Sequence, residues 1–415
     1  MPASRALLDF KGLLLFIPAL FPLLPLHLAS GLLVAWAIFS LVYFIAFPKQ
    51  RIAFPIQMLL PIAMFLLFLI ALPFANDHAN QSSYVERNLA WLIIPISFWM
   101  TGITERKQWF KIIFFFVSGY TLLMLYAHTV TLLAFRSLKD IHVTSLTYLY
   151  RTNFENYSGI HPAYATLFSA LSIIYCVYYF LSAIELSLIK KILILLVALL
   201  HLSSTIVLAS RMALVATIIA TIVLVFSNRT YIKQGIVIIS TFLIVGAYFT
   251  INTPFISSRM KEVSSEALQM PTQQTGNTLS IRTGIYTCVF TLLKEHWLLG
   301  LTPGDLQVNL NNCYGNINAN DLKKEEYNTH NEYFNKWLSF GLVGVCLLIA
   351  ILIIPFIMAI KGKFILFACF LILMGIVLFS ENMFSRQYGL FFFLLIYSPA
   401  LLIISSENIK QNINN

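Results

Sequence analysis

The sequence contains few charged residues. Asp, Glu, Lys and Arg together make up 11% of its 415 positions, whereas 59% are hydrophobic. Water-soluble globular domains carry roughly 25% charged residues, so this composition excludes that class and predicts an integral membrane protein. Apolar stretches long enough to cross a hydrocarbon core of about 30 Å recur along the chain.

Two kinds of catalytic motif are absent. The chain has no Gly-rich loop followed by Lys-Ser or Lys-Thr, so we expect no ATP site. Its long outer loop has no Asp-x-Asp and no His/Asp cluster at metal-ligand spacing, because Asp305 and Asp321 lie in separate turn-like settings. We therefore expect a protein that works without a metal or other cofactor.

Cysteine is also scarce, with five residues in the chain. Cys176, Cys346 and Cys369 lie in apolar stretches and are most simply small core residues. Cys288 and Cys313 both fall in the long outer loop, where oxidising conditions would permit a disulfide. The spacing does not show whether their geometry allows one.

The apolar stretches predict an all-α, polytopic membrane protein with about twelve transmembrane helices. Their approximate bounds are 12–27, 29–47, 54–74, 88–103, 110–134, 161–183, 189–208, 212–227, 235–251, 338–360, 364–379 and 389–405. A second apolar stretch follows the first within a few residues, and no small-residue cleavage pattern separates them. We therefore expect the first stretch to be retained rather than removed as a signal peptide.

Most of the basic residues lie in alternate connections between the apolar stretches. Those that would lie on the cytoplasmic side are Arg5, Lys11, Lys49, Arg51, Arg106, Lys107, Lys111, Lys190, Lys191, Arg229, Lys233, Lys361, Lys363 and Lys410. Because cytoplasmic loops are enriched in Lys and Arg, this pattern predicts that both chain ends lie inside. The net charge of +10 is thus dispersed over loops, which argues against a nucleic-acid partner.

One long polar segment divides the chain. We expect nine transmembrane helices in residues 1–251, a large outer loop in 252–337 and three transmembrane helices in 338–415, all in one integrated membrane domain. Within the loop, apolar positions at helical spacing predict an amphipathic helix from Arg282 to Gly300. The Asn-rich run from Asp305 to Thr329 is interpreted as a solvated surface loop.

The segment HNEYFNKWLSFGLVG lies where this loop returns to a hydrophobic span. It contains His330 and Asn331, then nine residues, then Gly341, two residues and Gly344. This spacing resembles the histidine motif of the O-antigen ligase-like superfamily, and its position at the membrane end of the largest outer loop also fits that family. We expect the two glycines to permit close helix packing.

Two further segments resemble the same family, and together the resemblance covers roughly residues 190–390. Ser210 and Arg211 in VLASRMALVAT are similar to its Ser-Arg pair at an outer membrane boundary. Arg282 in SIRTGIYTCVF, followed by EHWLLGLTPGD, resembles a segment in which an arginine begins a helix and a Leu-Gly-x-x-x-Gly stretch ends it.

The resemblance implies a metal-independent glycosyltransferase in the bacterial inner membrane, with its active site facing the periplasm. The donor would be an undecaprenyl-diphosphate-linked glycan, and the acceptor, in the reading we favour, the lipid A-core. Polymerisation of O-antigen or capsule repeat units, in which a growing glycan is the acceptor, and glycan transfer to protein are the alternatives. A flippase or transporter of lipid-linked glycans is the alternative of another class, but it would place ionisable residues near mid-membrane and show related halves.

Three residues are the principal site candidates. His330 could act as general base on the acceptor hydroxyl, because imidazole titrates near neutral pH. It could instead donate a hydrogen bond to the diphosphate, or be an exposed loop histidine. Arg211 and Arg282 are candidates for binding the diphosphate, because guanidinium groups stay charged and donate in a fork. The alternatives are an interfacial anchor for Arg211 and a solvent-exposed helix start for Arg282.

Four residues are supporting candidates. Asn331 could orient the histidine or cap the following helix, and Ser210 accompanies its arginine. Glu381 and Arg386 in SENMFSRQYG could line a cavity or pair with each other. Other outer residues that could contact the acceptor are Asp77, His78, Glu86, Arg87, His161 and Tyr164.

Overall fold

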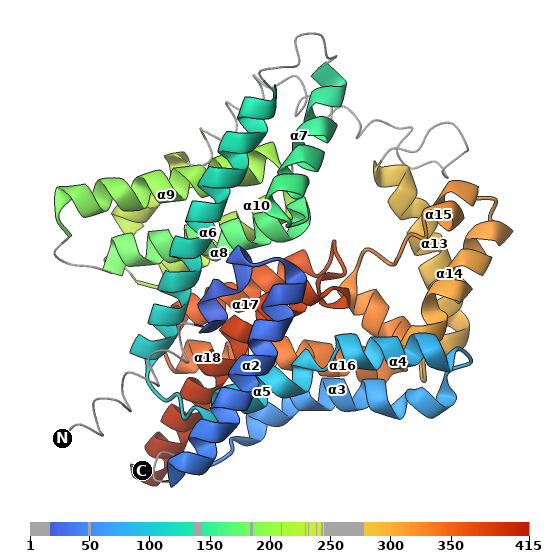
Figure 1. Cartoon of the computed structure of the whole chain (residues 1–415), viewed down its shortest axis with the longest axis horizontal. Helices are drawn as coiled ribbons and strands as arrows, with labels where there is room; N and C mark the ends of the chain where they lie inside the picture. Colours follow the sequence, from blue (N-terminus) through green and yellow to red (C-terminus); the bar gives the residue numbers. More distant parts are fainter. Residues whose placement is uncertain are drawn as a thin grey trace.

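The computed structural model describes residues 17–48, 51–135, 143–182, 186–208, 210–228, some positions between 230 and 244, and 278–414. The regular elements in these residues are all helices (Figure 1). Seven helical stretches are long and apolar enough to cross a membrane: Leu26–Ala46, Ile56–Phe74, Arg106–Ala134, Pro162–Ser182, Leu188–Val207, Glu332–Lys361 and Gln387–Glu407. The predicted all-α, polytopic membrane fold is confirmed, whereas the count of about twelve spans stays a prediction.

The labelled helices have the following bounds. The longer ones are α2 (Leu26–Ala46), α6 (Arg106–Phe135), α8 (Pro162–Ser182), α9 (Leu188–Val207), α16 (Glu332–Lys361) and α18 (Gln387–Asn414). The shorter ones are η1 (Ile17–Leu23), η3 (Ile56–Met58), α3 (Leu59–Ile70), η4 (Leu72–Phe74), α4 (His78–Arg87), α5 (Ala90–Met100), α7 (Val143–Ser158), α10 (Arg211–Phe226), α13 (Thr278–His296), α14 (Pro303–Asn316), α15 (Asn320–Lys324), α17 (Ile365–Val377) and η7 (Met383–Ser385). The predicted span 235–251 and the loop residues 252–277 lie largely or wholly outside the described residues.

The first predicted span is not one continuous α-helix in its described part. Residues 17–23 form the 3-10 helix η1, and α2 begins only at Leu26. Pro18, Pro22 and Pro25 interrupt this stretch, and each lacks the backbone N–H that an α-helix interior needs. Hydropathy alone does not detect this interruption.

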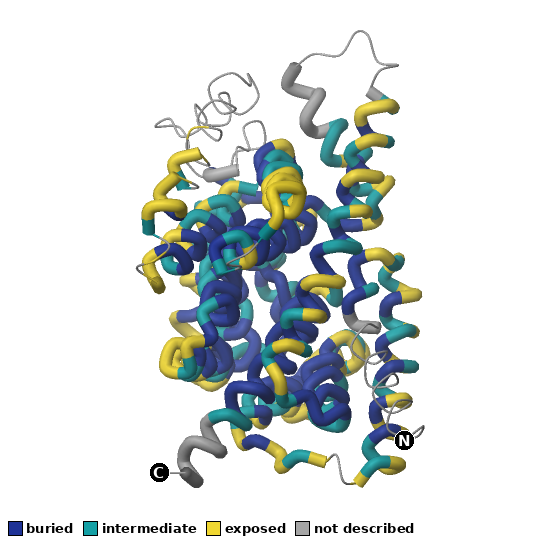
Figure 2. The backbone as a smooth tube through the Cα atoms, turned by 90° about the vertical axis from the view of Figure 1, so that its left-hand side faces the viewer, coloured by how far each residue is buried: buried dark blue, intermediate teal, exposed yellow. Residues whose placement is uncertain are grey.

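Helix α18 is the central helix of the bundle. In the most apolar stretch of this helix, 94% of the residues are buried inside the protein. Other helices therefore surround α18 rather than lipid. The ring of Phe392 packs against Phe116 and Phe168, with ring centres 5.4 and 4.6 Å away. Trp109 Nε1 donates to the carbonyl oxygen of Ile396 at 2.8 Å, which joins α6 to the same helix. Figure 2 shows the buried backbone running through the middle of the molecule and exposed residues on its outside.

At one end of the bundle a single arginine joins the start of α6 to α18 and to the turn after α16. Arg106 Nη2 donates to Glu407 Oε2 at 2.6 Å and to the carbonyl oxygen of Gly362 at 2.7 Å. Its Nη1 donates to the carbonyl oxygen of Lys363 at 3.3 Å. Arg106 begins α6, Glu407 lies in the last part of α18, and Gly362 and Lys363 follow α16. Lys107, Lys361 and Lys363 lie nearby in the sequence, and we call this region the basic end.

The opposite end carries the described part of the large loop, and we call it the loop end. Asp305 in α14 accepts hydrogen bonds from the backbone of Asn76 and Asp77, at 2.9 and 3.1 Å. The backbone N–H of Glu332 donates to Leu378 at 2.8 Å, which joins the start of α16 to the end of α17. These contacts place the turn after α16 at the basic end, and the connections before α4 and after α17 at the loop end. The assignment of either end to a side of the membrane stays a prediction.

The loop is more regular than its composition indicates. The interpretation of Asp305–Thr329 as a surface loop was wrong, because α14 and α15 occupy most of it. Thr302 caps α14 by accepting from the Asp305 N–H at 3.3 Å, and Leu306 and Leu310 are buried one helical turn apart. A disulfide joins Cys288 in α13 to Cys313 in α14, with Cα atoms 5.7 Å apart. The Asn-rich helix thus packs against the predicted amphipathic helix.

Helix α16 is interrupted at Gly341, where φ is 63° and ψ is −156°. At this break the backbone of residues 298–302 lies against the backbone of residues 338–342, and we call the contact the backbone clasp. Its hydrogen bonds run from Leu301 N–H to Leu338 O at 2.7 Å, from Thr302 N–H to Ser339 O at 3.1 Å and from Leu342 N–H to Leu298 O at 3.1 Å.

The clasp exists because the helix is broken. In a continuous helix Leu342 N–H would donate to Leu338 O. Here Leu342 donates to Leu298, and the Leu338 carbonyl accepts from Leu301 instead. Gly341 supplies the positive φ that this exchange requires. The two glycines of the histidine motif therefore serve close backbone packing, since a Cβ on Gly344 would also overlap the carbonyl oxygen of Lys336.

We expect Gly341→Ala to destabilise the protein strongly. A Cβ at this position would overlap the carbonyl oxygen of Leu298, and the backbone has a φ that alanine disfavours. The thermal unfolding midpoint should fall by about 5 °C or more. Gly31→Ala is the matched control, because no atom lies within 4 Å of a Cβ added in α2. Equal midpoints for the two variants would contradict the role given to the clasp.

Candidate functional site

His330 lies in the tight turn before α16. Its φ is 44°, a left-handed conformation that costs a residue with a side chain on the order of 1–2 kcal/mol and that recurs at functional sites. The side-chain oxygen of Asn328 accepts from the His330 N–H at 2.9 Å and holds the turn. With 28% of its side chain exposed, the imidazole is presented at the loop end rather than enclosed.

Glu381 lies opposite the imidazole, in the connection between α17 and α18. Its Oε2 is 3.5 Å from Nδ1 of His330. The partner of one ring nitrogen sets which nitrogen carries the proton. A carboxylate beside Nδ1 favours the Nδ1–H form, so Nε2 is the nitrogen that can accept a proton. The sequence offered two roles for Glu381, lining a cavity or pairing with Arg386, and the structure instead places its carboxylate beside the histidine.

Arg282 reaches the same connection from α13. Its Nη2 donates to the carbonyl oxygen of Ser380 at 3.2 Å, next to Glu381. A guanidinium has five N–H donors, and this bond uses one of them. Because the side chain is only partly buried, the group can also bind an anion at this surface. Helix α13 therefore brings a permanent positive charge close to the histidine and its carboxylate.

Asn331 caps helix α16. Its side-chain oxygen accepts from the Phe334 N–H at 3.1 Å, which is the capping role considered from the sequence. Its own carbonyl oxygen accepts from Thr329 Oγ1 at 2.9 Å. Asn382 Nδ2 donates to the same hydroxyl at 3.0 Å. These bonds fix the helix start immediately after His330 and tie it to the residue that follows Glu381.

A buried ion pair lies beneath this surface and was not singled out in the sequence. Lys336 Nζ is 2.9 Å from Glu332 Oε1, and their side chains are 3% and 0% exposed. The second carboxylate oxygen of Glu332 accepts from the Phe384 N–H at 2.9 Å. Buried charges are tolerated only when paired and hydrogen-bonded. The pair therefore joins the first turn of α16 to the turn that follows Glu381.

Arg386 and His161 belong to the same neighbourhood. Burial lowers the pKa of His161, and the guanidiniums of Arg386 and Arg151 lower it further, whereas the carboxylates of Glu155 and Glu381 act in the opposite direction. Charges influence one another in this way only at short range or in poorly screened surroundings. The structure therefore places Arg386 and Glu381 both near His161, and it adds Arg151 and Glu155, which the sequence gave no reason to select.

The packing of α10 shows at which end of the bundle Ser210 and Arg211 lie. Helices α10 and α17 run antiparallel, because Cys369 Sγ donates to the Ala220 carbonyl at 3.4 Å while the last residues of α10 line one cavity with the first residue of α17. The start of α10 therefore lies at the loop end. Ser210 is its N-cap residue and Arg211 its exposed first residue.

An apolar groove begins beside the histidine motif. It has a volume of about 530 Å³ and lies between α16 and α17. Tyr333 and Phe379 line it at the loop end, and Phe356 lines it farther towards the basic end. Ile353, also in its wall, is 48% exposed, so the groove opens on the outer surface of the bundle. A groove with these walls suits a hydrocarbon chain rather than a polar ligand.

The outer residues near Asp77 hold the loop in place. Burial acts to raise the pKa of Asp305, but hydrogen bonds from the backbone of Asn76 and Asp77 and from Thr302 outweigh it and hold the pKa below its usual value. Gln81, fully buried in α4, accepts from the N–H of Gly304 at 2.8 Å. Helix α14 therefore packs against α4 and against the connection that precedes α4.

Two histidines inside the bundle were also not selected from the sequence. His128 in α6 contacts Tyr150 and Ser204, with ring nitrogens 2.7 Å from each hydroxyl. His201 in α9 contacts Thr121 at 3.0 Å and also Ser169. Both rings have hydrogen-bond partners on neighbouring helices, the arrangement by which polar groups join helices in membranes. Their partners come from distant parts of the chain, so no local motif reveals them.

The fold and the polar groups at the loop end define a multi-pass membrane protein with one candidate site at a bundle end. The sequence profile of the O-antigen ligase family matches residues 192–349, which confirms the resemblance to the O-antigen ligase-like superfamily. The matched segment contains Ser210, Arg211, Arg282, His330 and Asn331, whereas Glu381 and Arg386 lie beyond it. The match supports an O-antigen ligase or polymerase type of function. No curated protein matches the chain.

Breaking the buried ion pair should cost more than removing it. We expect Lys336→Met to leave the Glu332 carboxylate buried without its counter-charge and to lower the stability by about 3–5 kcal/mol. The double variant Glu332→Gln with Lys336→Met should recover most of the loss. Thermal unfolding midpoints of the parent, Lys336→Met and the double variant measure this, with Lys324→Met as an exposed control. A double variant no more stable than Lys336→Met would contradict the pairing.

Docking of α14 should weaken in acid. The pKa of Asp305 is lowered in the folded protein. The stabilisation that its ionised carboxylate gives to the folded protein is therefore present above the unfolded-state pKa and is lost as the pH falls through the folded-state pKa. We expect amide hydrogen exchange in residues 303–316 to quicken in acid, after correction for intrinsic rates. Asp305→Asn should exchange faster at neutral pH and lose much of the acid effect. Asp321→Asn, on the exposed surface of α15, should behave like the parent.

Proposed function

We propose that the chain is a metal-independent membrane glycosyltransferase that transfers a glycan from an undecaprenyl-diphosphate-linked donor to the lipid A-core. The observation that carries this proposal is the pairing of His330 with Glu381, 3.5 Å apart, beside Arg282 and at the end of the bundle where Tyr333 and Phe379 line an apolar groove. Transfer from a lipid diphosphate donor requires three things: a base for the acceptor hydroxyl, a cation that binds the diphosphate, and an apolar surface for the lipid chain.

The groove supports a lipid-linked donor. A polyprenyl chain between α16 and α17 would bring its diphosphate to the loop end, where Tyr333 and Phe379 line the groove. Arg282 and Arg211 are the proposed diphosphate-binding residues, and Arg386 is a supporting one. Guanidinium groups suit this task because they remain charged and donate to two phosphate oxygens at once.

The proposed reaction is a single displacement at the anomeric carbon. The oxygen of the acceptor hydroxyl forms the new bond to this carbon while the bond to the donor diphosphate breaks. His330 Nε2 takes the hydroxyl proton, and Glu381 stabilises the imidazolium that forms. The departing diphosphate carries the bonding electrons away, and the arginines stabilise its growing charge. Each step is assigned to a residue of this chain.

The proposed orientation places the loop end in the periplasm and the basic end in the cytoplasm. It follows from the enrichment of Lys and Arg in the connections at the basic end. Undecaprenyl-linked glycan, lipid A-core and membrane lipids are the proposed partners in a bacterial inner membrane. Neither nucleotide nor nucleic acid has a part in the proposed reaction.

His330→Ala should abolish transfer without unfolding the protein. Loss of a general base lowers rates by about 10²–10⁴-fold. The measurement is transfer of a labelled glycan from a defined lipid-linked donor in proteoliposomes, together with the unfolding midpoint. His296→Ala, at the end of α13, is the matched control and should retain full activity. Full activity of His330→Ala would exclude the proposed base.

The same assay tests the acceptor and the class of protein. Lipid A-core and a second lipid-linked glycan are offered separately. Product on lipid A-core supports the ligase, whereas product only on the second glycan identifies a polymerase. Movement of the label across the membrane without a new covalent bond would instead identify a flippase and overturn the proposed function.

A further inference from the structure

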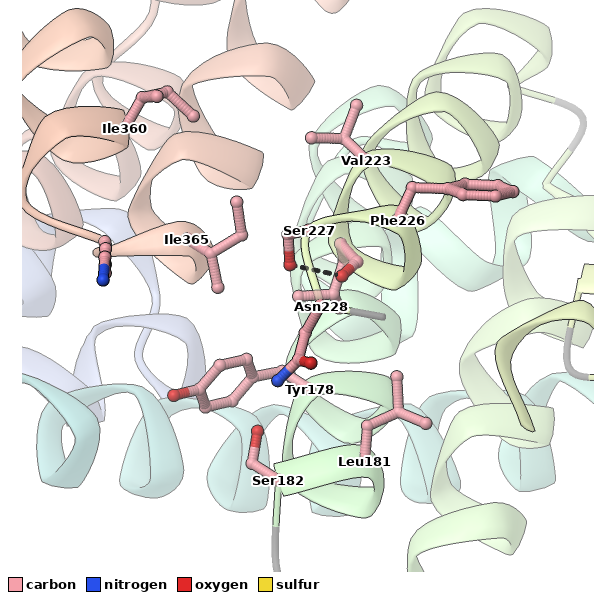
Figure 3. A pocket seen from close by; sticks show the side chains of 11 residues that line it. Tyr178, Leu181, Ser182, Val223, Phe226, Ser227, Asn228, Ile360 and Ile365 are labelled. Carbon is pink, nitrogen blue, oxygen red and sulfur yellow. Dashed lines mark hydrogen bonds between the residues drawn. The ribbon is translucent and has the colours of Figure 1, made fainter. Parts of the chain in front are cut away.

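A second cavity lies at the basic end, far from the candidate site along the bundle. It has a volume of about 770 Å³ and lies between the last residues of α8, the end of α10 and the turn from α16 to α17. Figure 3 shows Ile360 and Ile365 on one side of it and Val223 and Phe226 on the other. The proposed glycosyl transfer does not use this cavity.

The walls are apolar over most of their area and polar at one margin. Phe226 and Ile360 are 56% and 45% exposed, so the apolar side opens on the outer surface of the bundle. Ser182 and Asn228 lie at the ends of the helices, where the bundle meets water. The cavity therefore has an apolar side on the outer surface of the bundle and a polar margin at its end. A cavity of this kind suits an amphipathic ligand.

Lys363 supplies the charge at the polar margin. It lines the cavity and is exposed. Its backbone is held by Arg106, whose Nη1 and Nη2 donate to the carbonyl oxygens of Lys363 and Gly362 at 3.3 and 2.7 Å. The carboxylate of Glu407 is already paired with Arg106 at 2.6 Å. The turn thus fixes the start of the lysine side chain, and its ammonium group is available for an anion.

Among the described residues that line this cavity, one is a cation and none is a carboxylate. The amide NH₂ of Asn228 can donate to the same anion, since its side-chain oxygen accepts from the Thr230 N–H at 3.0 Å. One cation and a neutral donor suit a singly charged headgroup. Basic pockets between membrane helices bind anionic lipid headgroups by this combination of charge and apolar wall.

We propose that this cavity is a binding site for an anionic phospholipid. The phosphate lies at Lys363 and Asn228, and an acyl chain lies along Val223, Phe226 and Ile360. A small soluble anion would leave the apolar walls in water, and a zwitterionic lipid would bring the cation of its own headgroup close to the lysine and weaken the attraction. A phospholipid with a net negative charge satisfies both parts of the cavity.

The test compares phosphatidylglycerol with phosphatidylcholine on the full chain in detergent. Unfolding midpoints give the stabilisation by each lipid, and native mass spectrometry gives the retained lipid. Phosphatidylglycerol should stabilise the parent and Lys363→Arg more than phosphatidylcholine does. Lys363→Gln should lose this difference, with affinity reduced about fivefold, the factor expected for one basic residue near an anionic lipid. Each variant is compared with its own phosphatidylcholine value, so altered basal stability does not affect the result.

Lys111→Gln is the matched control, because Lys111 is also exposed near the basic end but does not line the cavity. It should keep the preference for phosphatidylglycerol. Equal stabilisation of the parent by both lipids would overturn the proposal, as would equal losses in the two variants. Stabilisation by glycerol phosphate as large as that by phosphatidylglycerol would show a site for a small anion and would also overturn it.

Discussion

An α-helix leaves no backbone N–H free along its interior, so a loop carbonyl can accept a hydrogen bond from a helix N–H only at a helix end or where the helix is interrupted. In this chain the interruption lies at Gly341, and the clasp with residues 298–302 uses the groups that it releases. The clasp attaches the end of α13 and the start of α14 to α16. It also separates a short helix, which begins just after His330, from the long helix that continues through the bundle.

The candidate site depends on this break in α16. Its three principal groups at the loop end come from α13, from the turn before α16 and from the connection after α17. Backbone contacts and one buried ion pair hold these segments together: Arg282 to Ser380, Glu332 to Phe384 and Lys336 to Glu332. The histidine and its carboxylate take little part in this scaffold. Substitution of His330 or Glu381 should therefore have little effect on the fold, so that it reports on their proposed role in the reaction.

The sequence predicted those features that are encoded locally. Hydropathy identified most of the described spans, and the histidine motif indicated close packing at Gly341 and Gly344, because each depends on neighbouring residues. The break in α16 at Gly341 was not predicted from the sequence. Helix α14 was missed because Asn-rich composition is typical of loops, whereas its buried leucines and disulfide depend on packing against α13. The Glu332–Lys336 pair has the spacing of an ordinary exposed helical pair, and only the tertiary structure shows that it is buried. For the same reason the histidines between the membrane helices were not found.

The arrangement of charge at the loop end explains why one site can suit a lipid diphosphate. Arg282, Arg386 and Arg151 lie in the neighbourhood of two carboxylates, Glu381 and Glu155, so the cations are in excess. Negative charge increases on the leaving group during the proposed displacement, and an excess of fixed cations stabilises that state more than the bound donor. Glu381 offsets part of this excess at the one place where a positive charge forms, which is the protonated imidazole. In the proposed reaction the groove would determine direction: with a lipid chain between α16 and α17, the diphosphate would meet the arginines and the sugar would extend beyond the membrane boundary. The proposed acceptor would then approach from the water-facing side of His330, where its hydroxyl could reach Nε2.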